Sequence, residues 1–448
     1  MSIRTVKKIS VIGVGFVGLT MSVCFASRGF SVYAVEQDTR KVEAINRGLP
    51  PFYEPMLEEL LNRAIKNGTF ACTTNYKDSI INSDITFITV GTPPRENGDI
   101  DLSFLINAAE EIGNILKYKK EYHLIVVRST VIPGTTEGVI KPIIEEKSNL
   151  KVGLDVGLCM NPEFLSEGSA ILNILNPSRI VIGEYDKRSG DMLENFYRSF
   201  YGEECPPILR VNIPTAEMIK YASNIFLAAR VSLINEIANI CEKVKGVDVV
   251  KVAEGVGLDP RIGSLYLKAG LGFGGSCLPK DLKALINFSR SLGYEPEMLK
   301  ATLNVNERQP FRILDVAKEA VGDLKGKRVA VLGLAFKPET SDVREAPSIK
   351  IIKHLLDEGA DVVVYDPKAI EEVKHIFNNK IVYAKSALEC IRGADCCLIV
   401  TEWEEFKSLK PEDFLREMKK PVVIDGRRIF NPKIFAEKLS FKAIGLGR

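Results

Sequence analysis

The chain has 448 residues, of which 46% are hydrophobic and 26% are charged, and its formal net charge at pH 7 is +2. These values are ordinary for a globular protein, and the length allows roughly two or three domains. Without a long run of like charges, we expect no nucleic-acid partner and no basic membrane-binding surface. The apolar stretch 221–240 also contains Arg230, Glu236 and three asparagines. Buried charges of this kind are costly in a bilayer, so we expect no membrane span.

Cysteine usage points to a reducing compartment. The nine cysteines are scattered and form no CxxC pair, and there are only three histidines. A disulfide framework needs paired cysteines in a short secreted chain, so we expect a cytoplasmic protein. No Cys/His cluster has the spacing of a zinc site, and no metal is predicted. Cys396 and Cys397 lie in an apolar run and are interpreted as core packing.

Residues 1–200 alternate short β-rich runs with helical patterns. The β-rich runs are almost continuously apolar, which is typical of a parallel sheet covered by helices on both faces. The expected strands are 8–13, 31–36, 85–90, 123–128, 157–160 and 179–183.

The segment ISVIGVGFVGLT carries Gly13, Gly15 and Gly18 in a GxGxxG pattern, directly after the first strand. The first glycine permits a tight turn, the second lets a pyrophosphate approach the backbone, and the third lets helix and strand pack closely. The second strand ends at Glu36, where a carboxylate would hold the ribose hydroxyls and repel a 2′-phosphate. The pattern therefore predicts an NAD site; the alternative is that the glycines serve packing only.

Three later strands of this half end in polar residues, within the segments GTP, ST and NPE. In an open α/β sheet the ligand lies beyond the carboxyl ends of the strands, so Thr92, Thr130 and Glu163 should converge on the nicotinamide region. Thr130 and Glu163 could then contact a reacting water or alcohol. Turn or capping chemistry is the other interpretation of both residues.

Residues 215–244 are predicted to form one long helix that joins two lobes. Lys220 and Asn224 are four residues apart and share a face of this helix. Since their neighbours are apolar, Lys220 either extends to solvent or belongs to an active site. The spacing alone favours a solvent-seeking lysine.

The segment GFGGSCLPKD contains the most reactive side chain that the sequence offers. Gly274 and Gly275 should leave room for a ligand, and Pro279 suits the first turn of a helix over 279–292. Cys277 then stands just before a helix N-terminus, which favours the thiolate. Asp281 falls one turn further and could orient a water molecule or a base.

A thiolate, a lysine and an amide together describe nucleophilic capture of a carbonyl, with the oxyanion stabilised by Lys220 and Asn224. With NAD, one reaction gives each part a role. An alcohol is oxidised to an aldehyde, Cys277 traps the aldehyde as a thiohemiacetal, and a second hydride leaves. Water then releases the acid from the thioester.

The strand–helix alternation restarts near residue 325, with strands expected at 328–333, 361–366, 396–401 and 422–425. We predict an α/β protein with two doubly wound, Rossmann-like lobes joined by a long central helix and a helical middle domain. The expected domains are 1–208 (NAD-binding), 209–310 (helical, with the catalytic cysteine) and 311–448 (the second Rossmann-like lobe). No full GxGxxG follows Gly333, so a mononucleotide fits the last lobe better than a second dinucleotide.

At this point the chain resembles a known family, the UDP-glucose/GDP-mannose dehydrogenases. The motifs that carry the resemblance span nearly the whole chain: GVGFVG, VGTP, RSTVIPGT, NPEFLSEG, AEMIKYASN, DPRIG, GFGGSCLPKD, LGLAFKPETSDVRE, YDP and DGRR. The resemblance implies an NAD-dependent enzyme that oxidises the C6 hydroxyl of a nucleotide sugar to a carboxylate, with UDP-glucose converted to UDP-glucuronate. GDP-mannose, UDP-galactose and a UDP-N-acetylhexosamine are the alternative substrates. A sensor of NAD and nucleotide sugar without turnover is the alternative from another class, but it would not need the thiol and its neighbours.

The resemblance implies that residues 209–310 carry a dimer interface and that residues 311–448 bind the nucleotide sugar. It also implies residue roles. The catalytic residues are Cys277, Lys220, Asn224, Asp281, Glu163 and Thr130. The cofactor contacts are Ile12, Gly13, Gly15, Phe16, Val17, Gly18, Glu36, Lys41, Thr92, Thr130, Glu167, Lys280 and Arg344. The substrate contacts are Glu163, Phe164, Leu165, Lys220, Asn224, Arg261, Lys268, Phe273, Gly274, Phe336, Lys337 and Arg427.

In the family, the residue that matches Arg261 reaches a neighbouring subunit's site, which implies a homodimer or a larger homo-oligomer. One cofactor position departs from the family pattern. Glu36 stands where the family usually has aspartate, and its longer side chain changes the geometry at the ribose.

Overall fold

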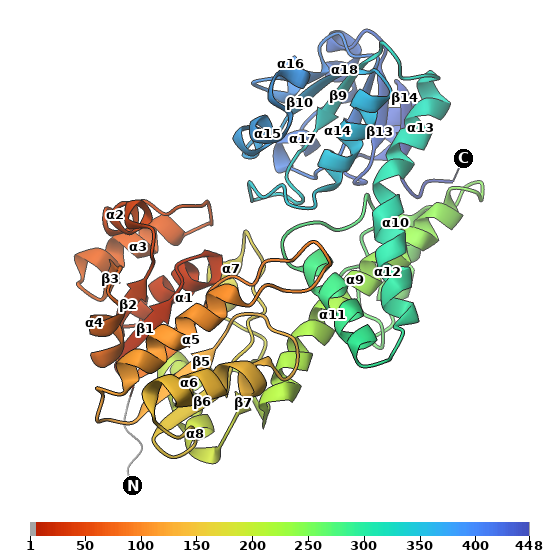
Figure 1. Cartoon of the computed structure of the whole chain (residues 1–448). Helices are drawn as coiled ribbons and strands as arrows, with labels where there is room; N and C mark the ends of the chain where they lie inside the picture. Colours follow the sequence, from red (N-terminus) through yellow and green to blue (C-terminus); the bar gives the residue numbers. More distant parts are fainter. Residues whose placement is uncertain (1–5, 448) are drawn as a thin grey trace. The chain divides into compact units, whose positions relative to one another are not determined.

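The computed structural model describes residues 6–447. They form two compact units, residues 6–223 and residues 224–447, and each unit is built on a mainly parallel β-sheet (Figure 1). The predicted α/β fold with two Rossmann-like lobes is therefore confirmed. Within residues 6–447 no helix is both long and apolar enough to cross a membrane.

The first unit contains an eight-stranded sheet of order β3-β2-β1-β4-β5-β6-β7-β8. Its first six positions have the strand order of a dinucleotide-binding fold, whose ligand lies at the carboxyl ends of β1 and β4. The pair β6–β7 is antiparallel, so the prediction of a purely parallel sheet is wrong there. The strands are β1 (Lys8–Ile12), β2 (Ser31–Val35), β3 (Phe70–Thr73), β4 (Ile85–Ile88), β5 (His123–Val127), β6 (Val156–Met160), β7 (Ile180–Glu184) and β8 (Ile208–Asn212).

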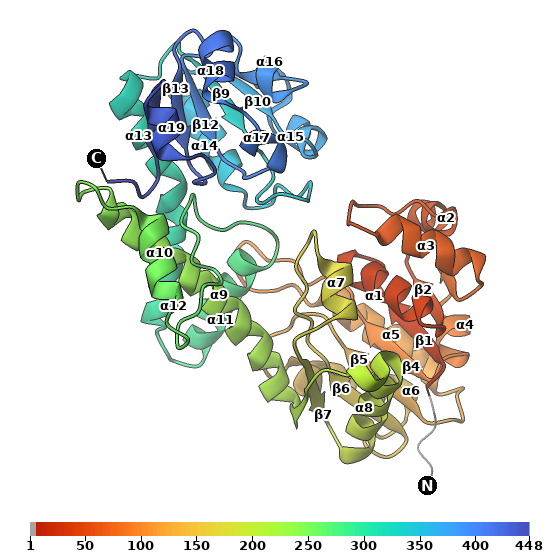
Figure 2. The ribbon, with the colours of Figure 1, turned by 180° about the vertical axis from the view of Figure 1, so that it is seen from behind.

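Helices cover both faces of this sheet, as near-continuous apolar strands require. Figure 1 shows α5 and α6 over one face, and Figure 2, from behind, shows α1 and α8 over the other. The helices are α1 (Phe16–Ser27), α2 (Thr39–Asn46), α3 (Leu57–Lys66), α4 (Tyr76–Ile81), α5 (Ser103–Leu116), the π-helical η1 (Thr136–Ile140), α6 (Lys141–Ser148), α7 (Ala170–Leu175), α8 (Lys187–Tyr201) and η2 (Gly202–Glu204).

The long helix predicted over 215–244 is present as α9 (Ile213–Cys241), and it passes through the boundary between the units at residues 223 and 224. The other helices of the second unit are α10 (Val249–Gly257), α11 (Leu278–Ser291), α12 (Glu297–Arg308), η3 (Gln309–Phe311), α13 (Arg312–Val321), α14 (Pro347–Asp357), α15 (Ile370–Phe377), η4 (Asn378–Lys380), α16 (Ala387–Ile391), α17 (Glu404–Lys407), α18 (Pro411–Glu417) and α19 (Pro432–Ala436).

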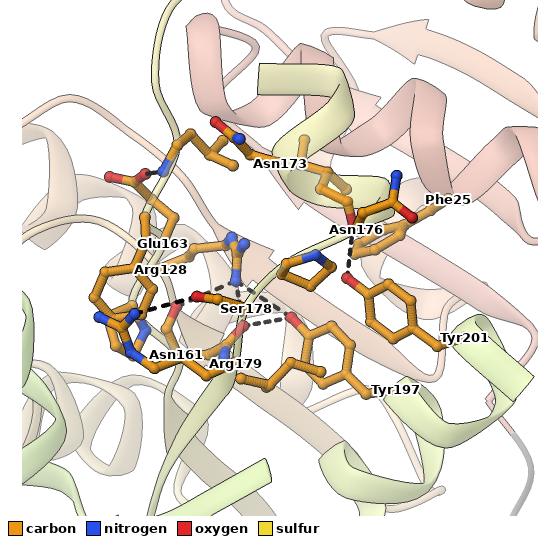
Figure 3. Close-up of a pocket in the computed structure, with 16 residues that line it drawn as sticks. Phe25, Arg128, Asn161, Glu163, Asn173, Asn176, Ser178, Arg179, Tyr197 and Tyr201 are labelled. Carbon is orange, nitrogen blue, oxygen red and sulfur yellow. Dashed lines mark hydrogen bonds between the residues drawn. The ribbon is translucent and has the colours of Figure 1, made fainter. Parts of the chain in front are cut away.

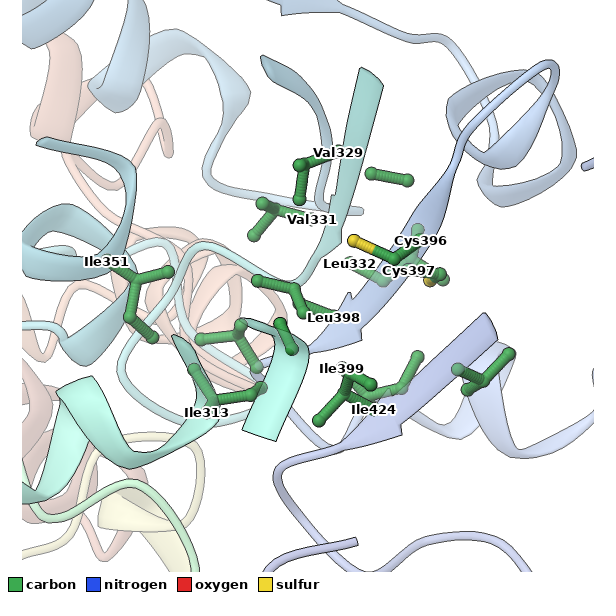
Figure 4. Packing of buried hydrophobic residues seen from close by; sticks show 14 of the residues in the cluster. Ile313, Val329, Val331, Leu332, Ile351, Cys396, Cys397, Leu398, Ile399 and Ile424 are labelled. Atoms are coloured by element: carbon green, nitrogen blue, oxygen red, sulfur yellow. The ribbon is translucent and has the colours of Figure 1, made fainter. Parts of the chain in front are cut away.

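The second unit contains a fully parallel six-stranded sheet of order β11-β10-β9-β12-β13-β14. Cys396 and Cys397 are fully buried in its core, as the apolar run predicts (Figure 4). The strands are β9 (Arg328–Leu332), β10 (Asp361–Tyr365), β11 (Val382–Tyr383), β12 (Cys396–Ile399), β13 (Val422–Asp425) and β14 (Ser440–Ala443).

Candidate active site

The turn between β1 and α1 has the geometry that a dinucleotide requires. Gly13 has φ +94°, a backbone conformation that residues other than glycine rarely adopt. A methyl group on Gly18 would lie 2.0 Å from the carbonyl oxygen of Gly13, so this position must be glycine for the helix to pack on the strand. A methyl group on Gly15 would meet no atom within 4 Å, so the turn is open at the N-terminus of α1. These residues fit a bound pyrophosphate.

Glu36 follows β2, at the position expected for the ribose contact. Its Oε1 atom accepts hydrogen bonds from the backbone of Gln37 at 2.9 Å and of Asp38 at 3.2 Å. The carboxylate is therefore oriented by its own turn, although its side chain is longer than aspartate's.

The loops after β4 and β5 are tied together at the sheet edge. The hydroxyl of Thr92 donates to the carbonyl of Thr130 at 2.8 Å, and the hydroxyl of Ser129 donates to the carbonyl of Val90 at 2.6 Å. The proton of Thr92 is thus used within the protein. A ligand could therefore donate to the lone pairs of this hydroxyl, or contact the backbone.

Lys220 does not extend to solvent, so the interpretation that its spacing alone favours is wrong. It is 3% exposed, and its ammonium donates to Oε1 of Glu163 at 2.8 Å. The other carboxylate oxygen, Oε2, accepts the backbone N–H of Leu165 at 2.6 Å. Burial raises the pKa of Glu163, but the charge and hydrogen bond of Lys220 outweigh it, and the pKa lies below its ordinary value. Glu163 is therefore an ionised carboxylate at neutral pH.

Cys277 precedes the first residue of α11, as predicted, and its side chain is exposed. Seven of the other cysteines are buried and Cys205 is half-buried. The Ser276 hydroxyl lies 3.5 Å from the Cys277 sulfur. Cys277 is thus the most accessible thiol in the chain, at a helix end that stabilises negative charge.

Asp281 connects two other predicted residues in the second unit. Its Oδ2 atom accepts from the Asn224 amide at 2.6 Å, and its Oδ1 atom accepts from the Lys280 ammonium at 2.6 Å. Asp281 is 1% exposed and Asn224 is 7% exposed, so the contact is buried. The backbone N–H of Asp281 also donates to the Cys277 carbonyl at 2.9 Å, which places the carboxylate one turn from the thiol.

Gly274 and Gly275 make room for the chain itself, which corrects the expectation that they leave space for a ligand. A methyl group on Gly274 would lie 2.5 Å from the Glu345 carbonyl oxygen, and one on Gly275 would lie 2.8 Å from the Phe336 ring. The Gly275 N–H also donates to the Arg344 carbonyl at 2.8 Å. The cysteine-bearing turn is therefore held against the segment that carries Phe336 and Lys337.

In the second sheet, a carboxylate already satisfies the backbone amides that follow β9. Asp366, at the end of β10, accepts from the backbone N–H groups of Leu334 at 2.7 Å and Ala335 at 3.1 Å, and from the Trp403 indole at 2.9 Å. A dinucleotide would need such amides for its phosphates. This agrees with the expectation that a mononucleotide fits the last lobe better than a second dinucleotide.

Arg427 is the predicted substrate contact with an unused buried donor. Its Nε atom donates to the Val400 carbonyl at 2.6 Å, whereas its buried Nη2 atom has no hydrogen-bond partner among residues 6–447. Phe273 is buried in the same unit, where its N–H donates to Asn306 at 2.7 Å.

The remaining predicted contacts lie nearer the surface. Arg261 and Arg344 are exposed and pair with Asp259 and Asp342, two residues before them. Lys41 and Lys268 are exposed, and Glu167 is half-buried in the loop that follows Glu163.

Sequence reasoning missed two buried carboxylates that hold the site's loops. Glu217, on α9, accepts from the backbone N–H groups of Gly134 at 2.6 Å and Thr136 at 2.8 Å. Glu54 accepts from those of Gly168 and Ala170, both at 2.7 Å. Glu217 is an acidic residue within the largely apolar segment AEMIKYASN, which indicates a buried carboxylate. The sequence around Glu54 gives no indication of its hydrogen-bond partners.

Comparison with known proteins places these features in a family. Three family models match consecutive segments: the NAD binding domain of the UDP-glucose/GDP-mannose dehydrogenase family over residues 7–201, the central domain over 214–308 and the UDP binding domain over 330–432. The first model covers the glycine-rich turn, which confirms NAD as the cofactor. The third confirms a nucleotide-binding domain in the last lobe.

Individual proteins of this family are similar to the chain over nearly its full length. The chain is 47% identical to a UDP-glucose 6-dehydrogenase of Haloferax volcanii, with 94% of this chain and 97% of that protein covered. It is 42% identical to one of Bacillus subtilis, with 95% and 90% covered. The structure of a UDP-glucose dehydrogenase from Pyrobaculum islandicum matches with a TM-score of 0.91 and 38% identity, over 99% of each chain. The chain belongs to the UDP-glucose/GDP-mannose dehydrogenase family.

Proposed function

We propose that the protein is a UDP-glucose 6-dehydrogenase, which oxidises UDP-glucose to UDP-glucuronate in two NAD-dependent steps. The observation that carries the proposal is the exposed Cys277 thiol at the start of α11, one turn from the buried Asp281–Asn224 pair. The full-length similarity to UDP-glucose 6-dehydrogenases supports UDP-glucose as the substrate.

In the proposed mechanism, NAD held at the glycine-rich turn would supply the hydride acceptor for both oxidations of the sugar's C6 carbon. Asp281 and Thr130 position the water that assists removal of the hydroxyl proton in the first step. The Cys277 thiolate then adds to the aldehyde carbon, and Lys220 and Asn224 stabilise the oxyanion of the thiohemiacetal. After the second oxidation, Glu163 guides the water that hydrolyses the thioester. Its lowered pKa supports this role, because only the ionised carboxylate can accept a proton from water.

Two further groups complete the proposed site. The glycine-rich turn, Glu36, Thr92 and the other predicted contacts near them hold NAD. Arg427, with its unused Nη2 donor, binds the nucleotide's phosphates together with Lys337. We also propose the domain division 1–208, 209–310 and 311–448, which the ranges of the three matched family models support.

A homodimer is part of the proposal. Phe226, Leu233 and Ile240 follow one another at intervals of seven on α9 and are 72%, 58% and 61% exposed. Seven-residue spacing places them along one face of the helix, and such an apolar face is typical of a subunit interface. Arg261, whose side chain is 87% exposed, could then reach the partner's site. The cysteine usage supports a cytoplasmic location.

The test is NADH formation against a panel of UDP- and GDP-sugars. UDP-glucose should give the highest kcat/KM, above UDP-galactose, UDP-N-acetylglucosamine and GDP-mannose. A higher kcat/KM with another sugar would reassign the substrate, and no NADH with any of them would favour a sensor.

A further inference from the structure

A cavity of about 230 Å³ lies beneath the loop that carries Glu163, wholly within the first unit (Figure 3). Its wall is formed by the segments that follow β5 and β6, by the stretch 173–180 and by α8. Arg128 and Arg179 both line it, together with the aromatic residues Phe164 and Tyr197.

Neither arginine has a carboxylate within ion-pair distance among residues 6–447. The two hydroxyls of Ser178 and Ser223 accept from Arg179, at 3.3 and 3.1 Å. The guanidinium carbon of Arg179 lies 4.0 Å from the centre of the Phe164 ring. The one carboxylate on the wall, Glu163, already binds Lys220 and the Leu165 N–H. The cavity wall therefore carries an excess of positive charge.

The hydrogen bonds of Arg128 are one-sided. Its Nη1 atom makes all of them, to the carbonyl and side-chain oxygens of Asn161 and to the Tyr197 hydroxyl. Its Nε atom is buried without a partner among the described residues. A guanidinium has five donors, and a buried donor without an acceptor is destabilising.

Two side-chain amide oxygens on the wall are already used. Oδ1 of Asn161 accepts from both Arg128 and Tyr197, and Oδ1 of Asn173 accepts from the Ser166 backbone at 3.0 Å. The Glu163 carboxylate also attracts Arg128, whose charge helps to lower the Glu163 pKa. This one carboxylate is shared with Lys220, so it cannot balance both guanidiniums as well. An occupant that supplies acceptor oxygens and negative charge would satisfy both.

We propose that this cavity binds a small anion, a carboxylate or a phosphate, through Arg128 and Arg179. The volume is below that of ordinary drug-sized pockets, so the cavity suits a small anion. The rings of Phe164 and Tyr197 would contact a small organic body attached to the charged group. The wall includes Glu163, Phe164 and Leu165 of the proposed site, whereas neither arginine belongs to the proposed catalytic or substrate-binding residues. A loss of anion binding in an arginine variant is therefore distinguishable from a failure of the proposed reaction.

The test is equilibrium dialysis of the full chain with radiolabelled inorganic phosphate and, separately, radiolabelled acetate. NAD and UDP are present at saturating concentration, so that their own phosphate sites are filled. We expect saturable binding of one of these anions, with a stoichiometry of one per chain. Which anion binds identifies a phosphate or a carboxylate as the ligand.

Arg128→Met should weaken this binding at least tenfold. Arg179→Met should also weaken the binding. It replaces Arg128→Met as the test variant if Arg128→Met does not fold. Circular dichroism and NAD binding show whether each variant is folded. Arg188→Met is the matched control, because Arg188 also stacks on an aromatic ring, Tyr122 at 3.4 Å, but lies outside the cavity. The absence of saturable binding to the parent chain would overturn the proposal. Equal binding in the Arg128 and Arg188 variants would also overturn it, because the anion would then bind elsewhere.

Discussion

The ammonium of Lys220 and the carboxylate of Glu163 form a buried ion pair, with 2.8 Å between Nζ and Oε1. Their side chains are 4% and 8% exposed. Removing two charges from water costs free energy, which their mutual attraction offsets. Loss of either residue therefore leaves the other as a buried charge without a counter-ion. Substitution of either residue should therefore affect both the stability of the first unit and the proposed reaction.

Lys220→Met should lower both stability and turnover. The uncompensated Glu163 carboxylate should cost about 3–5 kcal/mol in the free energy of unfolding. If Lys220 also stabilises the oxyanion, kcat should fall by about a hundredfold or more, with a smaller change in KM. Urea unfolding and steady-state kinetics measure the two effects. The double variant Lys220→Met/Glu163→Gln should recover part of the stability and none of the turnover; unchanged kcat in the single variant would remove Lys220 from the mechanism.

The stability that Glu163 contributes should depend on pH. Its pKa in the folded protein is below the ordinary value of 4.5, so folding favours the ionised form. The contribution is therefore complete above pH 4.5 and is lost as pH falls through the folded-state pKa. The difference in unfolding free energy between the parent and Glu163→Gln should be large at neutral pH and shrink in acid. Glu43→Gln, at an exposed surface pair with Arg47, is the control and should show no such narrowing. A difference for Glu163→Gln that stays constant with pH contradicts the assignment.

Two glycines of the cofactor turn should respond differently to alanine. A methyl group on Gly15 meets no protein atom within 4 Å, so Gly15→Ala should fold normally but weaken NAD binding at least tenfold, roughly 1.4 kcal/mol. A methyl group on Gly18 lies 2.0 Å from the Gly13 carbonyl oxygen, so Gly18→Ala should destabilise the first unit itself. Thermal melting and NAD titration separate the effects. Normal NAD affinity in Gly15→Ala would place the pyrophosphate elsewhere.

Much of this architecture is readable from local sequence. The turn at Gly13 and the position of Cys277 before α11 follow from glycine, proline and apolar patterns within a few residues. The strands β3, β8, β11 and β14 were not predicted, since they are short or mix polar and apolar side chains.

Pairings between distant residues could not be predicted. Glu163 and Lys220 are 57 residues apart, as are Asn224 and Asp281, and their contacts depend on tertiary packing. Gly274 and Gly275 have the composition of an open ligand turn, yet Phe336 and the Glu345 carbonyl fill the space beside them. The sequence pattern could not distinguish room for a ligand from room for another part of the chain.

Alkylation should identify Cys277 first. It is exposed, whereas burial raises the pKa of the half-buried Cys205 thiol and so reduces its reactivity. Brief treatment of the native protein with iodoacetamide, followed by peptide mapping, should place the first label on residue 277 and abolish turnover. UDP-glucose should slow the labelling. Cys205→Ser is the control and should label at the same rate; a first label on any other cysteine contradicts the proposed nucleophile.

The apolar face of α9 should determine the oligomeric state. Phe226→Asp combined with Leu233→Asp places charges in the proposed interface, so light scattering should show monomers where the parent forms dimers or larger assemblies. Leu172→Asp, at a position on α7 that is 53% exposed, is the control and should leave the mass unchanged. A monomeric parent chain would remove the dimer from the proposal.

The stoichiometry of NADH formed per UDP-glucose consumed tests the central claim most directly. If Cys277 holds the aldehyde between the two oxidations, exhaustive reaction with excess NAD should give two NADH per UDP-glucose. UDP-glucuronate should be the only sugar product. One NADH per UDP-glucose, with free aldehyde accumulating in solution, would contradict the account.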